Sequence, residues 1–402
     1  MPTPPTTSLI AQSGPPLTGW AATAGSCLGL ERDARCHQAG LAALKTGAMT
    51  ADDVGYALGG LWGVPVAVVP ASALDPMAVL AALMNPGDGV LVAPALAARH
   101  RRRLELAVAA GHDVAIAPAG DQALLETLAE RTAAGRRVWY VADTLDARTG
   151  DRAPLEALWA LHDRAAGLHL LLDDTFGMGW CGAGGRGLAL GGAPTTARLV
   201  MLADLSRGPG AEVGVIASPD AGLVAAARPA FEPRMLSAVR LGAAMGVAAI
   251  APADWETLQG RLQKRMQLAD RLMRAHGLPR VGAADGPFRF VAAHAPAVAF
   301  AVVGRLLEAG HAVSATTVAA PGGPQPAIRF TLSLAQPLEA LQALLEELAR
   351  TLPEALDSAG TSLEALRRAH GGDGVAGPAT MIDLASWKAS RLSDSRGARS
   401  PG

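Results

Sequence analysis

Three acidic residues directly follow two short apolar runs near the middle of this 402-residue chain. Residues 168–172 precede Asp173 and Asp174, and residues 199–203 precede Asp204. Each run is too short for a helix, and its nearly continuous apolar character predicts a buried parallel strand. Ligands bind at the carboxyl ends of the strands in an open α/β sheet. These carboxylates are therefore candidates for a binding or catalytic site.

A parallel sheet is needed to hold such a site, and the chain carries the matching pattern. Further strands are predicted at residues 64–69 and 138–142, and residues 85–92 are predicted to form a turn that leads into another buried strand. Helices are predicted at residues 51–62 and 155–166. The helix at 155–166 connects two predicted strands, which makes a βαβ unit and hence a parallel sheet. Beyond residue 219 the pattern predicts helices at 221–227, 235–250, 254–276, 303–309 and 338–352, and strands at 289–292, 297–302 and 328–334. We therefore expect an α/β large domain and a smaller α+β C-terminal domain.

The composition is that of a globular protein, with 50% hydrophobic residues and a net charge of −1. The sequence lacks a long basic face that would suggest a nucleic-acid partner. It also lacks a run of about 18 apolar residues that would suggest a membrane span. Cys27, Cys36 and Cys181 lack metal-ligand spacing, so we expect no metal site and a reducing, cytoplasmic location. Residues 1–19 lack the charged start and apolar core of a signal peptide.

These patterns divide the chain into successive parts. We predict a disordered tail at 1–19, an N-terminal segment at 20–60, a large domain at 61–250, a linking helix at 251–280, a small domain at 281–355 and a disordered tail at 371–402.

The stretches around the candidate site resemble a known family. Residues 173–176 read Asp-Asp-Thr-Phe, residues 179–187 are glycine-rich and end in Gly-Arg-Gly, and residues 204–210 read Asp-Leu-Ser-Arg-Gly-Pro-Gly. Their order and spacing resemble the α-oxoamine synthases, which carry Asp-Glu-Ala-His, a Gly-x-x-Gly-x-x-Gly-Arg-Gly loop and Thr-x-(Ser/Gly)-Lys-x-x-Gly. This pyridoxal-phosphate (PLP) group includes 8-amino-7-oxononanoate synthase, glycine C-acetyltransferase and serine palmitoyltransferase. The resemblance extends over about residues 25–352 and implies a fold-type-I PLP-dependent transferase (aminotransferase-like) large domain with a mainly parallel sheet.

The resemblance assigns roles to four residues. Asp173 would pair with the pyridinium nitrogen of PLP, although a carboxylate in this place can also serve loop hydrogen bonds. Ser206 matches the residue before the family's lysine and would bind the cofactor if PLP is present. Ser72 would open a helix at residues 75–84 whose amide groups hold the cofactor phosphate, or would serve only as its cap. Arg329 matches the arginine that binds the amino-acid carboxylate, a task suited to a planar guanidinium, or it forms a structural ion pair.

The family's reactive lysine is replaced. Its position falls on Arg207, whose guanidinium stays protonated and cannot form an imine. Phe176 replaces a histidine near the pyridine oxygen, and Asp204 replaces a threonine that donates to the phosphate, where a carboxylate would be repulsive. The histidine that stacks on the pyridine ring falls on Ala98, with His100 two residues away as the alternative. We therefore expect no covalently bound cofactor, and PLP only as a non-covalent ligand.

Three further features have more than one interpretation. Residues 99–103, Arg-His-Arg-Arg-Arg, are typical of a solvated helix face, with an anion site for nucleotide phosphates as the alternative. Asp143 stands where the family has a glutamate. Residues 182–187 match the dinucleotide pattern G-x-G-x-x-G, but residues 174–181 separate them from the strand and glycines and a proline follow where a helix should start. We therefore reject a dehydrogenase fold.

Two functional classes are consistent with these residues. The first is a catalytically degenerate homologue that acts as a non-catalytic or regulatory partner subunit, as the lysine-free chain of heterodimeric serine palmitoyltransferases does. The second is an aminotransferase class I/II-like or acyl-CoA:amino-acid C-acyltransferase enzyme that uses the cleft with altered chemistry. The clustered losses favour the first. We expect a homodimer, or a heterodimer with an intact family member, and an acyl-CoA or amino-acid ligand.

Overall fold

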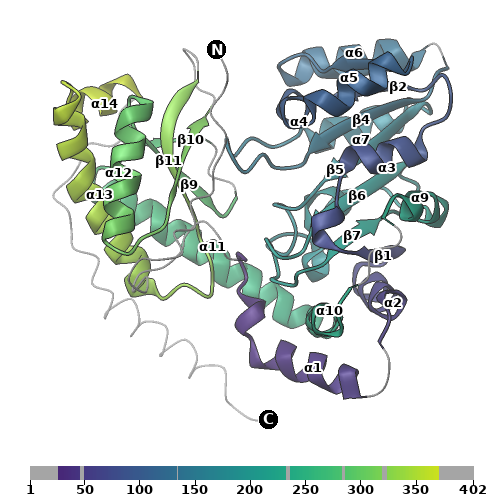
Figure 1. The fold of residues 1–402 in the computed structure, drawn as a ribbon, viewed down its shortest axis with the longest axis horizontal. Coiled ribbons are helices and arrows are strands. Elements are labelled where there is room, and N and C mark those ends of the chain that lie inside the picture. Colours follow the sequence, from purple (N-terminus) through teal and green to yellow (C-terminus); the bar gives the residue numbers. More distant parts are fainter. Residues whose placement is uncertain are drawn as a thin grey trace, which may run out of the picture.

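The computed structural model describes residues 26–45, 49–133, 135–231, 236–282, 286–318 and 324–370. Its strands form two sheets (Figure 1). The larger contains β1 (Val66–Val69), β2 (Gly89–Val92), β3 (Asp113–Ile116), β4 (Val138–Asp143), β5 (Leu168–Asp173), β6 (Leu199–Asp204) and β7 (Gly214–Ala217). The smaller contains β8 (Arg280–Val281), β9 (Phe288–Ala292), β10 (Ser314–Val318) and β11 (Gln325–Thr331).

The large sheet is mainly parallel, as predicted. Its order is β1-β7-β6-β5-β4-β2-β3, and strands β2 to β6 pair in parallel. Only β7 runs antiparallel to its neighbours β1 and β6. The sequence pattern did not predict β3 or β7. The predicted α/β class is confirmed.

Both faces of the large sheet are covered, which explains its continuous apolar strands. In β4, Trp139 and Val141 pack on one side, while Val138, Tyr140 and Ala142 pack on the other. The first side is covered by α3 (Pro76–Leu83), α4 (Pro94–Arg99), α5 (Arg101–Ala109) and α9 (Ala221–Ala227). Helices α6 (Asp121–Ala133) and α7 (Leu155–His162) lie on the second. Because side chains alternate along a strand, every residue of these central strands needs apolar surroundings.

Local signals set two helix starts before β2. Helix α2 (Ala51–Trp62) has the predicted bounds, because Thr50 and Asp53 form a capping box and Gly63 ends the helix at a φ of 72°. The prediction that Ser72 caps the next helix is wrong. Asp75 caps α3, its carboxylate accepting the Met77 amide at 2.9 Å, and Ser72 lies in the preceding 3-10 turn η2 (Ala71–Ala73).

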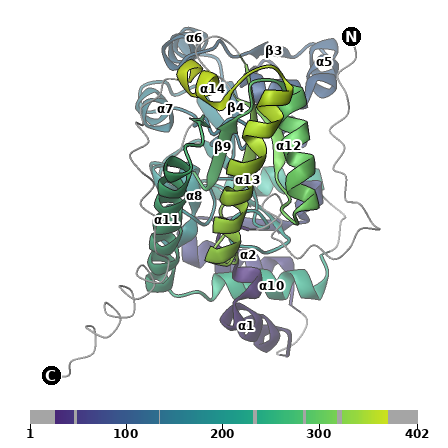
Figure 2. The same ribbon diagram turned by 90° about the vertical axis from the view of Figure 1, so that its left-hand side faces the viewer.

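The smaller sheet is covered on the face turned away from the larger one (Figure 2). Its covering helices are α12 (Pro296–Glu308), α13 (Leu338–Ser358) and α14 (Leu363–Ala369). The strand predicted at residues 297–302 is wrong, because these residues are helical within α12. Pro296 at the helix start and burial of Val298, Ala299, Val302 and Leu306 at helical spacing override the apolar run.

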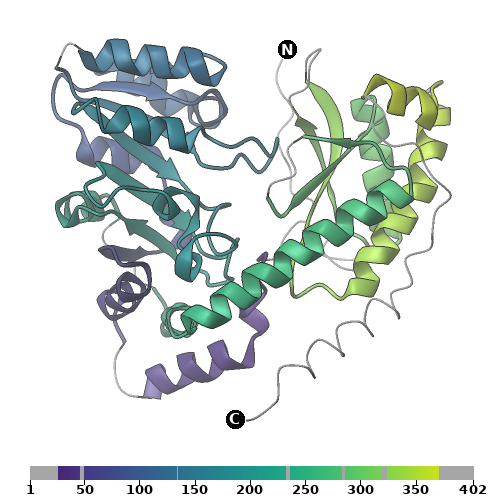
Figure 3. The same ribbon diagram turned by 180° about the vertical axis from the view of Figure 1, so that it is seen from behind.

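A long helix, α11 (Pro252–Ala275), runs from beside α10 (Ala238–Ala248) to the small sheet (Figure 3). Helix α10 packs closely on α1 (Ala34–Lys45), because glycines leave room for the neighbouring backbone: a Cβ at Gly40 would overlap the Gly242 carbonyl, and one at Gly246 the Cys36 carbonyl. The small-domain prediction of an α+β arrangement is confirmed by the sheet and its helices.

Some predictions concern residues outside the described part of the chain. These are the tails at 1–19 and 371–402, the first residue of the helix predicted at 235–250, and residues 320–323. Within the described ranges, none of the helices combines the length and apolarity required to cross a bilayer.

Candidate functional site

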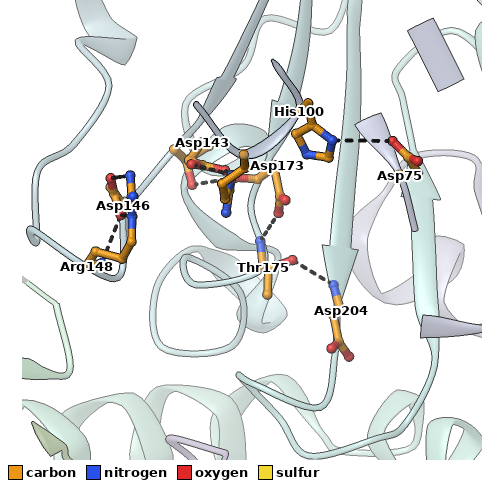
Figure 4. A network of polar contacts seen from close by, with 10 residues as sticks. Asp75, His100, Asp143, Asp146, Arg148, Asp173, Thr175 and Asp204 are labelled. Atoms are coloured by element: carbon orange, nitrogen blue, oxygen red, sulfur yellow. Dashed lines mark hydrogen bonds and ion pairs between the residues drawn. The ribbon is translucent and has the colours of Figure 1, made fainter. Parts of the chain in front are cut away.

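Three neighbouring strands each end in an aspartate at the same edge of the large sheet (Figure 4). Asp143 ends β4, Asp173 ends β5 and Asp204 ends β6. Asp143 and Asp173 are direct partners in the parallel register. The acidic edge predicted from Asp173 and Asp204 is therefore present, and Asp143 extends it by one strand.

The adjacent carboxylates Asp173 and Asp174 have different environments. The buried Asp174 accepts hydrogen bonds from the Thr144 hydroxyl and, at 3.0 Å, from the Ala189 amide, and burial raises its pKa to about 7. Asp173 is half-buried and accepts the Thr175 amide at 3.0 Å. Asp174 thus holds loops together, and Asp173 faces the edge of the sheet.

Asp143 is held by an arginine of the basic segment 99–103. Arg99 Nη2 donates to both Asp143 oxygens, at 2.5 and 2.7 Å. Burial, followed by the charge of Asp173, raises the pKa of Asp143 to about 7, and Arg99 opposes that rise. Arg101 and Arg102 are exposed, as expected for a solvated face. Within this segment, Arg99 therefore belongs to the site, whereas Arg101 and Arg102 face solvent.

Of the two candidates for the family's ring-stacking histidine, His100 lies near the acidic edge and Ala98 does not. Its Nδ1 is 3.9 Å from the Asp75 carboxylate, which also pairs with Arg103 (Figure 4). Burial lowers the pKa of His100, while the charges of Asp75 and Asp173 raise it. Ala98 is exposed on α4. Of the two candidates, His100 is therefore the one whose side chain lies near the acidic edge.

The turn after β6 carries Ser206 and Arg207. Asp204 accepts the Ser206 amide at 2.9 Å, and its own amide donates to the Thr175 hydroxyl at 3.0 Å. Ser206 is half-buried and Arg207 is exposed. The Cys27 amide donates to the Arg207 carbonyl at 3.0 Å, and the Leu334 amide donates to the Cys27 carbonyl at 2.9 Å. The N-terminal segment thus joins this turn to the small domain.

A cavity of about 180 Å³ lies between that turn and the small sheet. Its lining includes Arg207 and Phe176 from the large domain and Arg329 and Phe288 from the small domain. The Arg329 Nη2 donates to the Thr331 hydroxyl at 3.4 Å, and its Cζ lies 4.9 Å from the centre of the Phe288 ring. Burial, followed by the charge of Arg207, lowers the pKa of Arg329 to about 10, so it stays charged at neutral pH. The ion-pair alternative for Arg329 is not realised, since no acidic side chain in the described ranges forms a salt bridge with it.

The two described lysines do not line this cavity. Lys45 is the last residue of α1, and Lys264 is exposed on α11. Lys388 lies outside the described residues.

Comparison with known proteins gives consistent sequence matches. No family model matches the chain. It is 38% identical over 139 residues to an 8-amino-7-oxononanoate synthase of Mycolicibacterium vanbaalenii, which covers 33% of the chain and 35% of that relative. It is 34% identical over 172 residues to an 8-amino-7-oxononanoate synthase of Mycobacterium sp. (strain KMS), which covers 40% of the chain and 42% of that relative. The matched part thus spans less than half of either relative.

Solved structures extend the similarity to most of the chain. A Sphingomonas wittichii serine palmitoyltransferase superimposes with a TM-score of 0.67 at 20% identity, over 83% of this chain and 87% of that one. An 8-amino-7-oxononanoate synthase of Francisella tularensis gives a TM-score of 0.63 at 17% identity, over 83% and 97% of the two chains. Part of the chain is therefore similar in sequence to 8-amino-7-oxononanoate synthases, and most of it shares the fold of the α-oxoamine synthases. The predicted fold, type I of the PLP-dependent transferases, is confirmed.

The residues at the carboxyl edge of the large sheet do not fit PLP at both ends of the cofactor. Asp173 can face a pyridinium nitrogen, and His100 lies beside the same edge. At the other end, Asp204 is a carboxylate, and the Asp75 carboxylate lies at the start of α3, where it accepts the Met77 amide. Carboxylates repel a dianionic phosphate. With Arg207 in the turn after β6, these residues do not fit PLP held as a Schiff base.

The sequence pattern did not identify several residues of the site. The Arg99–Asp143 ion pair and the Asp75–Arg103 pair join residues far apart in the chain, and no spacing rule connects them. Asp75 carried one local signal, because aspartate before a proline is a common helix start. Phe288 and Thr331 reach the cavity only because the small domain folds against the turn after β6.

Proposed function

We propose that this chain is a catalytically degenerate α-oxoamine synthase homologue that forms no Schiff base and acts as a partner subunit. The observation that carries this proposal is the position of Arg207. It follows β6 in the turn that matches the family's lysine motif, and it lines the cavity shared by the two domains. A guanidinium in that place can bind anions but cannot form an imine.

The proposed loss of cofactor chemistry has support beyond Arg207. Asp204 lies at the strand end where the family has threonine, and Asp75 occupies the amino end of α3. Arg99 holds Asp143 beside Asp173, which places a closed ion pair at the acidic edge. These groups satisfy one another without a cofactor.

The subunit role is supported by an apolar surface. Leu41 on α1, Tyr56 on α2 and Val239 on α10 have exposed fractions of 57%, 87% and 75%. The three helices lie together at one end of the molecule (Figure 1). Exposed apolar side chains gathered on neighbouring helices are typical of an association surface. We propose a dimer through this end, either of two copies or with a lysine-bearing family member.

The test is reduction with borohydride after incubation with PLP, followed by peptide mapping. We expect no visible Schiff-base absorbance and no fixed adduct at position 207. A known synthase treated in parallel is the positive control. An adduct on Lys45 or Lys264 would contradict the proposal, because it would show that another lysine reaches the cofactor.

Co-expression tests the partner role. The chain should co-purify with a lysine-bearing homologue and raise that homologue's acyltransferase activity or its soluble yield. A homologue that is fully active and stable by itself, and that does not bind this chain, would contradict the subunit role.

A second candidate function is an enzyme with altered acid–base chemistry, favoured by Asp143. A carboxyl group with a pKa of about 7 is suited to proton transfer at neutral pH. Consumption of acyl-CoA with glycine, serine or alanine as acceptor would be measured for the chain alone and for Asp143→Asn. Turnover that the substitution abolishes would support this candidate over the subunit.

A further inference from the structure

We propose that Arg207 and Arg329 are the two arms of a binding site for a small dicarboxylate, in the cavity between the turn after β6 and the small sheet. The proposal rests on the function above in one respect, that no covalent cofactor occupies position 207. It adds a ligand class and gives the replaced residue a role of its own.

The two guanidinium groups converge on one cavity without an anionic partner. Arg207 and Arg329 both line it, and the charge of Arg207 contributes to lowering the pKa of Arg329. Neither forms a salt bridge with an acidic side chain in the described ranges of the chain. The charge of Asp146 raises the pKa of Arg329, but the Asp146 carboxylate already accepts hydrogen bonds from Arg148 at 2.8 to 3.2 Å. A partly buried pair of like charges is stabilised by a ligand that brings negative charge.

The Arg329 guanidinium is positioned to bind a planar anion. Its guanidinium contacts the face of Phe288 and one weak hydroxyl partner, Thr331 at 3.4 Å, so most of its donors stay available. The neighbouring strands hold it in place, since Arg329 pairs with Ser314 on β10 and with Phe290 on β9. Guanidinium groups bind carboxylates through two parallel hydrogen bonds.

The cavity also has an apolar side. The rings of Phe176 and Phe288 meet edge to face, 5.5 Å apart with an interplanar angle of 73°. A ligand with a short hydrocarbon segment between two carboxylates covers these rings and reaches both arginines. An inorganic phosphate would satisfy the charges and leave the rings uncovered. The volume of about 180 Å³ is several times the roughly 30 Å³ share of one water molecule, which is enough for a small diacid.

Isothermal titration calorimetry of the full chain tests this site. The probes are succinate and glutarate as dicarboxylates, acetate as a monocarboxylate, and inorganic phosphate. We expect a dicarboxylate to bind at least about tenfold more tightly than acetate or phosphate. Arg207→Gln and Arg329→Gln should each weaken that binding by roughly tenfold to a hundredfold, as expected for loss of a charged hydrogen-bonding group.

Control variants distinguish a loss of ligand binding from a loss of folding. Arg350→Gln removes an arginine of α13 that pairs with Glu347, and it should leave binding unchanged. Arg207 is exposed, so Arg207→Gln should unfold at the wild-type temperature even if Arg329→Gln does not fold. Arg329→Lys keeps a charge and removes the fork, and it too should weaken binding.

Three results would overturn the inference. They are no dicarboxylate binding to folded wild-type chain, phosphate binding as tight as that of the diacids, and unchanged binding in Arg207→Gln. None of them depends on the borohydride result, so the two proposals can fail separately. An adduct on Lys45 with intact diacid binding would overturn only the proposed function.

Discussion

Substitution of the arginine at the lysine position tests how deeply the cofactor site has changed. We expect Arg207→Lys to create neither PLP binding at micromolar cofactor nor synthase activity with glycine, serine or alanine and an acyl-CoA. The substitution supplies an amine in the right turn. It leaves Asp204 at the phosphate end and the Asp75 carboxylate at the start of α3.

The size of the remaining obstacle follows from Coulomb's law. Unit charges about 4 Å apart interact by roughly 1 kcal/mol in water and by about 4 kcal/mol at the effective dielectric constant of a protein surface. Asp204 is half-buried, and the phosphate carries close to two charges. The expected repulsion is about 2 to 4 kcal/mol, which weakens cofactor binding by roughly 30- to 900-fold.

The assay is visible absorbance of the lysine–PLP Schiff base during titration with PLP. The matched variant is Arg207→Lys combined with Asp204→Thr, which removes the carboxylate and restores a hydroxyl donor. We expect this double variant to bind PLP at least about 30-fold more tightly than the single variant. Thermal unfolding of both proteins controls for folding.

Saturation of the single variant by equimolar PLP would refute the reasoning. It would show that Asp204 turns away from the phosphate or is neutralised in place. Equal affinity of the single and double variants would carry the same meaning, and the obstacle would then lie elsewhere, for instance in the Arg99–Asp143 ion pair.

Three other outcomes are expected. Burial raises the pKa of Asp174 from its ordinary value of 3.8 to about 7 in the folded chain. Ionisation of Asp174 therefore lowers the free energy of unfolding by up to about 4 kcal/mol as the pH rises from 4 to 7. Above pH 7 we expect no further loss. Urea unfolding at pH 5 and pH 7.5 should therefore be less pH-dependent in Asp174→Asn than in wild type, and an unchanged slope would contradict the buried ionisation. Gly246→Val should lower the free energy of unfolding by about 1 to 3 kcal/mol or more, because the added Cβ would overlap the Cys36 carbonyl. Gly260→Ala has open space around the added Cβ and should not lower the unfolding temperature. Light scattering of the chain expressed alone should give twice its 40.8 kDa mass if two copies associate, and a stable monomer at micromolar concentration would contradict the homodimer.

Short-range signals predicted much of the chain correctly. The capping box at Thr50 and Asp53 and the glycine at position 63 set both ends of α2. The apolar runs before Asp173 and Asp204 became β5 and β6, because a strand buried on both faces must be apolar throughout. These features depend on residues a few positions apart, and the sequence contains them directly.

Tertiary contacts decided the rest. Residues 297–302 form an apolar run that fits a strand or a buried helix equally well, and packing of α12 on α13 and the small sheet selects the helix. The antiparallel direction of β7 depends on β1, which is distant in sequence.

The candidate site shows the same division. The sequence by itself determined that aspartates end the central strands and that arginine stands in the turn after β6. Only the fold decided that Asp174 turns inward while Asp173 faces the edge, and that His100 lies near this edge. The fold also decided that Arg207 and Arg329 line one cavity. The physical reason is that charge and burial act through space, so residues more than a hundred positions apart set each other's environment.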